Sequence, residues 1–168
     1  MTALREGDIE MKLPSGARGR KFDDESHGLS HCMKAVDLII ELNDRILFVE
    51  IKDPEQPGAP GMRHEEFVCR FRSGEIDREL ARKYRDSFLY EWAAQHLDKP
   101  VHYLVLVAIS ALDAAMLLAR TDALKRELPF GGPANGTWTR RFADGCAVFN
   151  LTEWNKHMAD FAVSRRGA

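Results

Sequence analysis

The segment that most constrains the fold of this chain is residues 33–53, MKAVDLIIELNDRILFVEIKD. It is rich in Ile, Leu, Val and Phe, and Asn43-Asp44 interrupt it with residue types that tolerate the positive φ angles of a tight turn. This pattern predicts an antiparallel hairpin with strands at residues 34–42 and 45–52. Three charged residues lie inside these otherwise apolar strands and require an explanation.

The expected register of the hairpin places the three charged side chains on one face. With the turn centred on residues 43–44, Asp37 lies opposite Glu50, and Lys52 follows Glu50 by two residues on the same face. Two facing carboxylates repel, and a divalent cation such as Mg²⁺ is the simplest neutraliser. The alternative is an exposed edge hairpin on which the charges are solvated. The opposite face is expected to be apolar and to meet the core, with Val36, Leu38, Ile40, Leu42, Leu47, Val49 and Ile51.

Asp37 followed by Glu50-Ile51-Lys52 at the end of the next strand resembles the D…(D/E)xK signature of the PD-(D/E)XK nuclease superfamily. The resemblance implies that residues 1–168 form one α/β domain with a restriction-endonuclease-like fold, in which helices flank a central mixed β-sheet with an antiparallel catalytic hairpin. It also implies that Asp37, Glu50 and Ile51 hold Mg²⁺ or Mn²⁺. Lys52 would orient or activate the attacking water, or stabilise the phosphorane charge.

The N-terminal part matches this superfamily less closely. Val36 stands where the superfamily has a proline before the aspartate. The alternation of Ile9, Met11 and Leu13 with polar residues predicts a strand that turns at residues 14–16 and pairs with residues 20–22, as the first strand of the meander. The helix that precedes this meander in the superfamily has one candidate, residues 3–11.

Two further groups before the hairpin are candidate metal ligands. Asp23, Asp24 and Glu25 could add a carboxylate to the site, as an upstream acid often does in the resembling family, or form a solvated loop. His27, His31 and Cys32 could bind zinc, because His at i and i+4 is a familiar helical spacing, although Gly28 and Ser30 disfavour a helix there.

Lys83 is the candidate catalytic residue after the hairpin. Pro and Gly at residues 53–61 predict a loop extending to Gly74, and residues 75–96 predict the longest helix. Lys83 falls within the apolar stripe of that helix, where a buried ammonium needs a partner. The resemblance implies an auxiliary lysine on this helix, whereas the alternative is a lysine that extends along the stripe to water.

The sequence after residue 100 predicts a strand buried on both faces at residues 101–109 and a second helix at residues 113–128. A hairpin is expected from residues 137–142 and 146–150. A short last helix is expected from residue 152 onward, and residues 164–168 are expected to form a frayed basic tail.

The composition is that of a globular protein of one domain, with 168 residues, 45% of them hydrophobic and 30% charged. No apolar run approaches the roughly 18–20 residues of a membrane span, and the N-terminus lacks an apolar signal-peptide core, so we expect a cytoplasmic protein without a membrane partner. Three cysteines without a CxxC pair are expected to be reduced. The net charge of −2 provides no global positive field, but a local basic surface can still bind phosphates.

Three classes of function remain open on the sequence alone. The first is a metal-dependent nuclease, an endo- or exonuclease for which DNA is favoured over RNA, and a homodimer would suit cleavage of two strands. The second is a catalytically idle nuclease-fold module that binds nucleic acid or a protein. The third is an unrelated α/β protein, in which Asp37 and Glu50 would point apart, or into solvent with no pocket between them.

Overall fold

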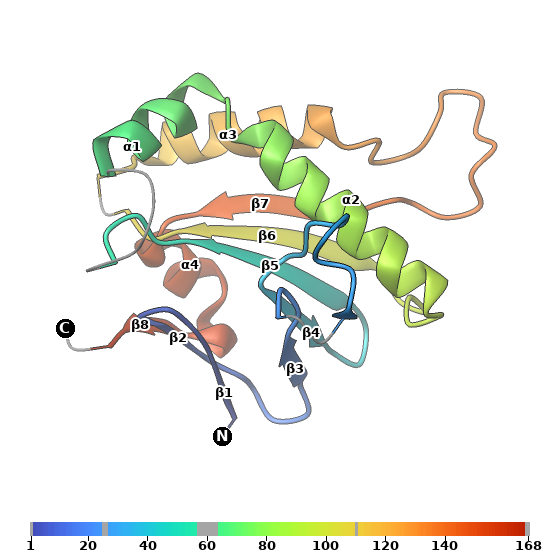
Figure 1. Cartoon of the computed structure of the whole chain (residues 1–168), viewed down its shortest axis with the longest axis horizontal. Coiled ribbons are helices and arrows are strands. Elements are labelled where there is room, and N and C mark those ends of the chain that lie inside the picture. Colours follow the sequence, from blue (N-terminus) through green and yellow to red (C-terminus); the bar gives the residue numbers. More distant parts are fainter. Residues whose placement is uncertain (1, 25–26, 57–63, 110, 167–168) are drawn as a thin grey trace.

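The computed structural model describes residues 2–24, 27–56, 64–109 and 111–166, and a mixed five-stranded sheet lies at its centre (Figure 1). The order of its strands is β3-β4-β5-β6-β7. The first three form an antiparallel meander, and β6 and β7 continue the sheet in parallel. The strands are β3 (Arg18–Lys21), β4 (Leu38–Glu41), β5 (Ile46–Lys52), β6 (Val101–Val107) and β7 (Gly145–Phe149). The chain is thus an α/β domain with a mixed sheet.

The β4–β5 hairpin has the register expected from the sequence. Leu38 pairs with Val49, and the Leu42 N–H donates to the Arg45 carbonyl across the turn. The strand β4 begins at Leu38 rather than at residue 34, because the preceding amides bond to a helix instead of to a neighbouring strand. The prediction that Val36 lies on the opposite face of the hairpin is wrong for the same reason, since Val36 packs in the helix-side core.

Three helices cover one face of the sheet, namely α1 (His64–Ser73), α2 (Asp77–Ala93) and α3 (Ala114–Glu127) (Figure 1). The predicted loop up to Gly74 is wrong, because α1 occupies its second half. Phe67 and Phe71, four residues apart, form a buried face on α1, and its acidic first turn and basic last turn suit the helix dipole. Within the described ranges, no helix combines the length and apolarity needed to cross a membrane.

The other face of the sheet packs against an antiparallel sheet of order β1-β2-β8 and against the helix α4 (Leu151–His157), followed by a short 3₁₀ helix, η2 (Ala159–Phe161). The strands are β1 (Ala3–Glu6), β2 (Ile9–Lys12) and β8 (Val163–Arg165). The N-terminal helix expected at residues 3–11 is therefore wrong. The strand at Ile9 is confirmed, but it pairs with β1 and β8, and residues 18–21 pair instead with β4.

The C-terminal third confirms the strand β6 and the helix α3 and corrects the last hairpin. Residues 137–142 do not form a strand, and among the described residues β7 pairs with β6. Arg140 instead donates to the carbonyl of Leu97, and Phe142 packs against α2, so this segment lies across the helix rather than in the sheet. The predicted frayed tail is also corrected, because residues 163–165 form β8.

Candidate active site

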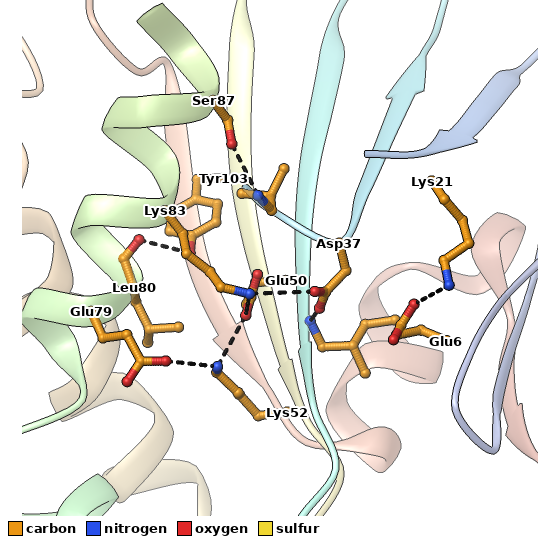
Figure 2. Close-up of polar contacts among 12 residues, drawn as sticks. Glu6, Lys21, Asp37, Glu50, Lys52, Glu79, Leu80, Lys83, Ser87 and Tyr103 are labelled. Atoms are coloured by element: carbon orange, nitrogen blue, oxygen red, sulfur yellow. Dashed lines mark hydrogen bonds and ion pairs between the residues drawn. The ribbon is translucent and has the colours of Figure 1, made fainter. Parts of the chain in front are cut away.

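Asp37 immediately precedes β4, where the register of the hairpin places it opposite Glu50. Its Oδ2 atom accepts the Ile51 N–H at 2.5 Å, and its Oδ1 atom lies 3.4 Å from the Lys83 ammonium. The residue is 4% exposed. The main chain of β5 thus holds one carboxylate oxygen and leaves the other facing α2 (Figure 2).

Glu50 lies in β5 and is fully buried. Its Oε1 atom contacts both lysine ammoniums, at 2.6 Å from Lys83 and 3.1 Å from Lys52. Its Oε2 atom is buried and has no hydrogen-bond partner among the residues that the structure describes. Burying a carboxylate oxygen without a donor or a cation costs free energy, so this oxygen is a candidate ligand-binding atom.

Lys83 reaches the two acids because α2 is fixed tightly against the sheet. The Tyr103 hydroxyl donates to the Leu80 carbonyl at 3.0 Å, and the Ser87 hydroxyl accepts the Val36 N–H at 2.9 Å. The side chain of Lys83 is 16% exposed and contacts both acids, so the alternative in which it extends along the helix to water is wrong (Figure 2). Its role in catalysis stays a prediction.

Lys52 closes the site on its outer side. Its ammonium bridges Glu50 and the half-exposed Glu79 of α2, at 3.1 and 3.0 Å. Glu79 was not predicted from the sequence, although it precedes Lys83 by four residues and therefore lies on the same helical face. Figure 2 also shows an ion pair between Lys21 and Glu6, at 2.8 Å, which joins the two sheets.

The charges of the site shift the pKa values of its members. Burial raises the pKa of Asp37 well above its usual value, the Glu50 charge raises it further, and Lys83 opposes both effects. Burial lowers the pKa of Lys83, but the carboxylates of Glu50 and Asp37 outweigh burial and raise it overall. Burial likewise lowers and Glu50 raises the pKa of Lys52, with a net rise. Both lysines therefore remain protonated at neutral pH.

The donor set fits a hard divalent cation better than a transition metal. The described residues contain no group of three or more His, Cys, Asp and Glu side chains suited to a metal. Asp37 and Glu50 provide two carboxylates, and the carbonyl of Ile51 is the main-chain oxygen that this residue could add, because its amide bonds to Asp37. Mg²⁺ typically binds one or two carboxylates and completes its shell with waters and phosphate oxygens. A cation bound to both acids would lie beside the Lys83 ammonium or replace it between the carboxylates.

The other predicted ligands that the structure describes lie outside the ion pairs that join Asp37, Glu50, Lys52 and Lys83. Asp23 is exposed, and its charge raises the pKa of Asp37. Asp24 is also exposed, and Glu25 lies outside the described residues. His27 uses its Nδ1 atom to accept the Leu29 N–H, and the described part of the chain holds no zinc-type cluster.

Comparison of the chain with protein-family models, with curated proteins and with solved structures found no match.

Proposed function

We propose that this protein is a metal-dependent nuclease that hydrolyses phosphodiester bonds in nucleic acid, with DNA favoured as the substrate. The observation that carries the proposal is the convergence of Asp37, Glu50, Lys52 and Lys83 from three separate elements. The helix α2 is distant from the hairpin in the sequence and forms a separate element, yet its Lys83 lies between the two acids. The proposed arrangement of the meander, α2 and β6 is restriction-endonuclease-like.

The charge of the cluster supports a cation together with a phosphodiester. Asp37, Glu50 and Glu79, when ionised, exceed the two lysine charges by one. A divalent cation with one phosphodiester adds a net single positive charge and brings the cluster to neutrality. Mg²⁺ or Mn²⁺, held by Asp37 and Glu50, would supply Lewis-acid polarisation of the phosphoryl group and a lowered water pKa.

The residues of the chain would then position the reactants for hydrolysis. Water loses a proton to solvent and attacks phosphorus, the bond to the leaving oxygen breaks, and that oxygen takes a proton from solvent. Negative charge increases meanwhile on the nonbridging phosphoryl oxygens. Lys52, which lies on the outer side of Glu50 and is held there by Glu79, places a protonated ammonium near that developing charge. Lys83 contacts both Glu50 and Asp37 and holds their carboxylates in position.

The second candidate is a nuclease-fold module without catalysis. It is favoured by one specific observation, which is that two lysines already contact Glu50 and neutralise the acid pair. A cation is then not required for the fold to tolerate the buried acids. The third class predicts that Asp37 and Glu50 point apart, or into solvent with no pocket between them. The burial of both acids and their contacts with Lys83 argue against the two diverging or pointing into solvent (Figure 2).

The test is a cleavage screen with plasmid, linear duplex, single-stranded DNA and RNA in Mg²⁺ or Mn²⁺. We expect cleavage of at least one substrate, and its loss on chelation and in each folded variant Asp37→Ala, Glu50→Ala and Lys52→Ala. Cleavage retained by folded Glu50→Ala would reject the mechanism. Absence of cleavage with every substrate would favour the idle module.

A further inference from the structure

A second cavity lies on the helix side of the sheet, beyond the candidate active site. It has a volume of about 450 Å³, within the range of small-molecule sites. Arg18 and Arg20 of the edge strand β3 line it, together with Glu91 and Gln95 near the end of α2. Two further acids, Glu41 and Asp98, also line the cavity. Ile39 and Ile46 provide an apolar wall.

This cavity belongs to the same sheet face and the same helix as the acid pair. Arg20 pairs with Ile39 across β3 and β4, and paired residues share a face, as do residues two apart such as Asp37 and Ile39. The strand rise then places Ile39 about 7 Å along the sheet from Asp37. On α2, Glu91 follows Lys83 by two turns, which is about 12 Å along the axis. The cavity is therefore about 7 to 12 Å from the candidate active site.

Glu91 carries the chemical signal. The residue is 2% exposed, and its Oε2 atom accepts Arg20 at 2.6 Å and lies 3.3 Å from His96 Nδ1. Its Oε1 atom is buried and has no hydrogen-bond partner among the described residues. A carboxylate oxygen in this state is stabilised by a ligand that brings one N–H donor.

Whereas Glu91 favours an N–H donor on the ligand, the arginines favour an anionic group. Arg18 contacts Glu41 at 2.8 Å, but its side chain is 79% exposed, and a guanidinium has five donors of which this contact uses one. Planar guanidinium groups favour phosphate, which they bind through paired hydrogen bonds. The ligand thus has an anionic group for Arg18, a ring for the isoleucine wall and an amino group for Glu91.

We infer that this cavity binds a nucleotide whose base carries an amino group, as a subsite for the strand that enters the candidate active site. The inference rests on the proposed function, because that function supplies nucleic acid as the substrate. The phosphate lies against Arg18, Arg20 keeps its ion pair with Glu91, and the base amino group donates to the second oxygen of Glu91. Cytosine meets this requirement and uracil does not, since uracil has a carbonyl oxygen in place of the amino group.

The test is calorimetric titration of the whole chain with cytidine and uridine monophosphates, in chelator and at low salt. We expect the cytidine nucleotide to bind about tenfold more tightly, because a site that hydrogen-bonds an amino group rejects an analogue lacking it. Arg18→Ala should lower the affinity for both nucleotides. Glu91→Gln should remove the difference in affinity between the cytidine and uridine nucleotides. The matched control is Arg5→Ala, because Arg5 also forms an exposed ion pair, with Glu10, but outside the cavity.

Absence of binding, equal affinity for the two nucleotides, or unchanged binding by Arg18→Ala would overturn the inference. The exposed Arg18 keeps the test decisive if Glu91→Gln does not fold. The chelator separates this result from catalysis. Nucleotide binding without cleavage of any substrate would reject the proposed nuclease activity and retain the nucleotide site. Cleavage without nucleotide binding would retain the nuclease activity and reject the nucleotide site.

Discussion

Two buried ionic clusters lie at the end of β5, and they differ in how fully their charges are satisfied. Asp53 follows Lys52 directly and accepts two hydrogen bonds from Arg165 of β8, at 2.7 and 2.8 Å. Glu50, three residues earlier, has one oxygen shared by two lysines and one oxygen without a partner among the described residues. The first cluster is closed, and the second has unused binding capacity.

This difference separates a structural ion pair from a candidate binding site. Arg165 matches Asp53 with the paired geometry that guanidinium and carboxylate prefer, and it ties β8 to the end of β5. The acids Asp37 and Glu50 face each other, so each raises the cost of the other charge. Strongly perturbed pKa values cluster at functional sites, so this acid pair is the better candidate for a binding site.

The largest expected effect concerns cleavage and uses one isosteric change in each cluster. Glu50→Gln should lower metal-dependent cleavage by about a thousandfold or more, because several kcal/mol of charge stabilisation are lost. Asp53→Asn should leave cleavage within a few-fold of wild type. Initial rates on the best substrate of the screen measure both, with circular dichroism to check folding. Equal losses in the two variants would remove the distinction between the clusters.

The next largest effect concerns stability and uses Lys83→Met. Without metal, the variant should lose about 3 kcal/mol in the free energy of unfolding, because the two buried acids keep one lysine instead of two. Addition of Mn²⁺ should recover much of this loss, because ligand binding to the folded state stabilises it. Denaturant titration with and without Mn²⁺ gives the comparison. A loss that Mn²⁺ does not reduce would show that the acids do not hold a cation.

A smaller effect is expected from Arg165→Ala, which opens the closed cluster. The free energy of unfolding should decrease by about 2 kcal/mol, since Asp53 loses its guanidinium while its neighbours are partly accessible to water. The affinity for Mn²⁺ should stay unchanged. Denaturant titration and calorimetry measure the two quantities, and a large decrease in Mn²⁺ affinity would show that the clusters are coupled.

The smallest effect concerns pH. Because burial and Glu50 raise the pKa of Asp37, the folded protein retains a proton that the unfolded chain releases at the ordinary Asp value. Stability of the metal-free protein should therefore fall as pH rises from about 4 through the raised pKa. Asp37→Asn should lack this part of the pH dependence. The pKa of Lys83 is raised, so this residue stabilises the folded state at every pH below the ordinary pKa of lysine. That stabilisation is lost only at alkaline pH. Identical pH profiles of wild type and Asp37→Asn would contradict the assignment.

The parts of the site that follow from local rules could be predicted from the sequence. A two-residue turn fixes the register of the hairpin, and this register places Asp37 opposite Glu50. Helical periodicity places Lys83 on the face that meets the sheet. The same rule could have identified Glu79, one turn before Lys83.

The parts that depend on distant contacts could not be predicted. The strands β1 and β2 pair with β8 from the other end of the chain, and no local pattern encodes such a partner. The helix α1 was not predicted, because the loop indicated by the Pro and Gly residues before it was extended as far as Gly74. Residues 137–142 have the composition of a strand, but contacts of Arg140 and Phe142 with the end of α2 decide their conformation.

The most direct test of the central claim is calorimetric titration of Mn²⁺ into the purified protein with a nonhydrolysable oligonucleotide. If Asp37 and Glu50 form a cation site, wild type takes up Mn²⁺ and Glu50→Gln does not, while Asp53→Asn binds as wild type does. No uptake by wild type, or equal uptake by Glu50→Gln, would contradict the claim that these two buried acids hold a metal.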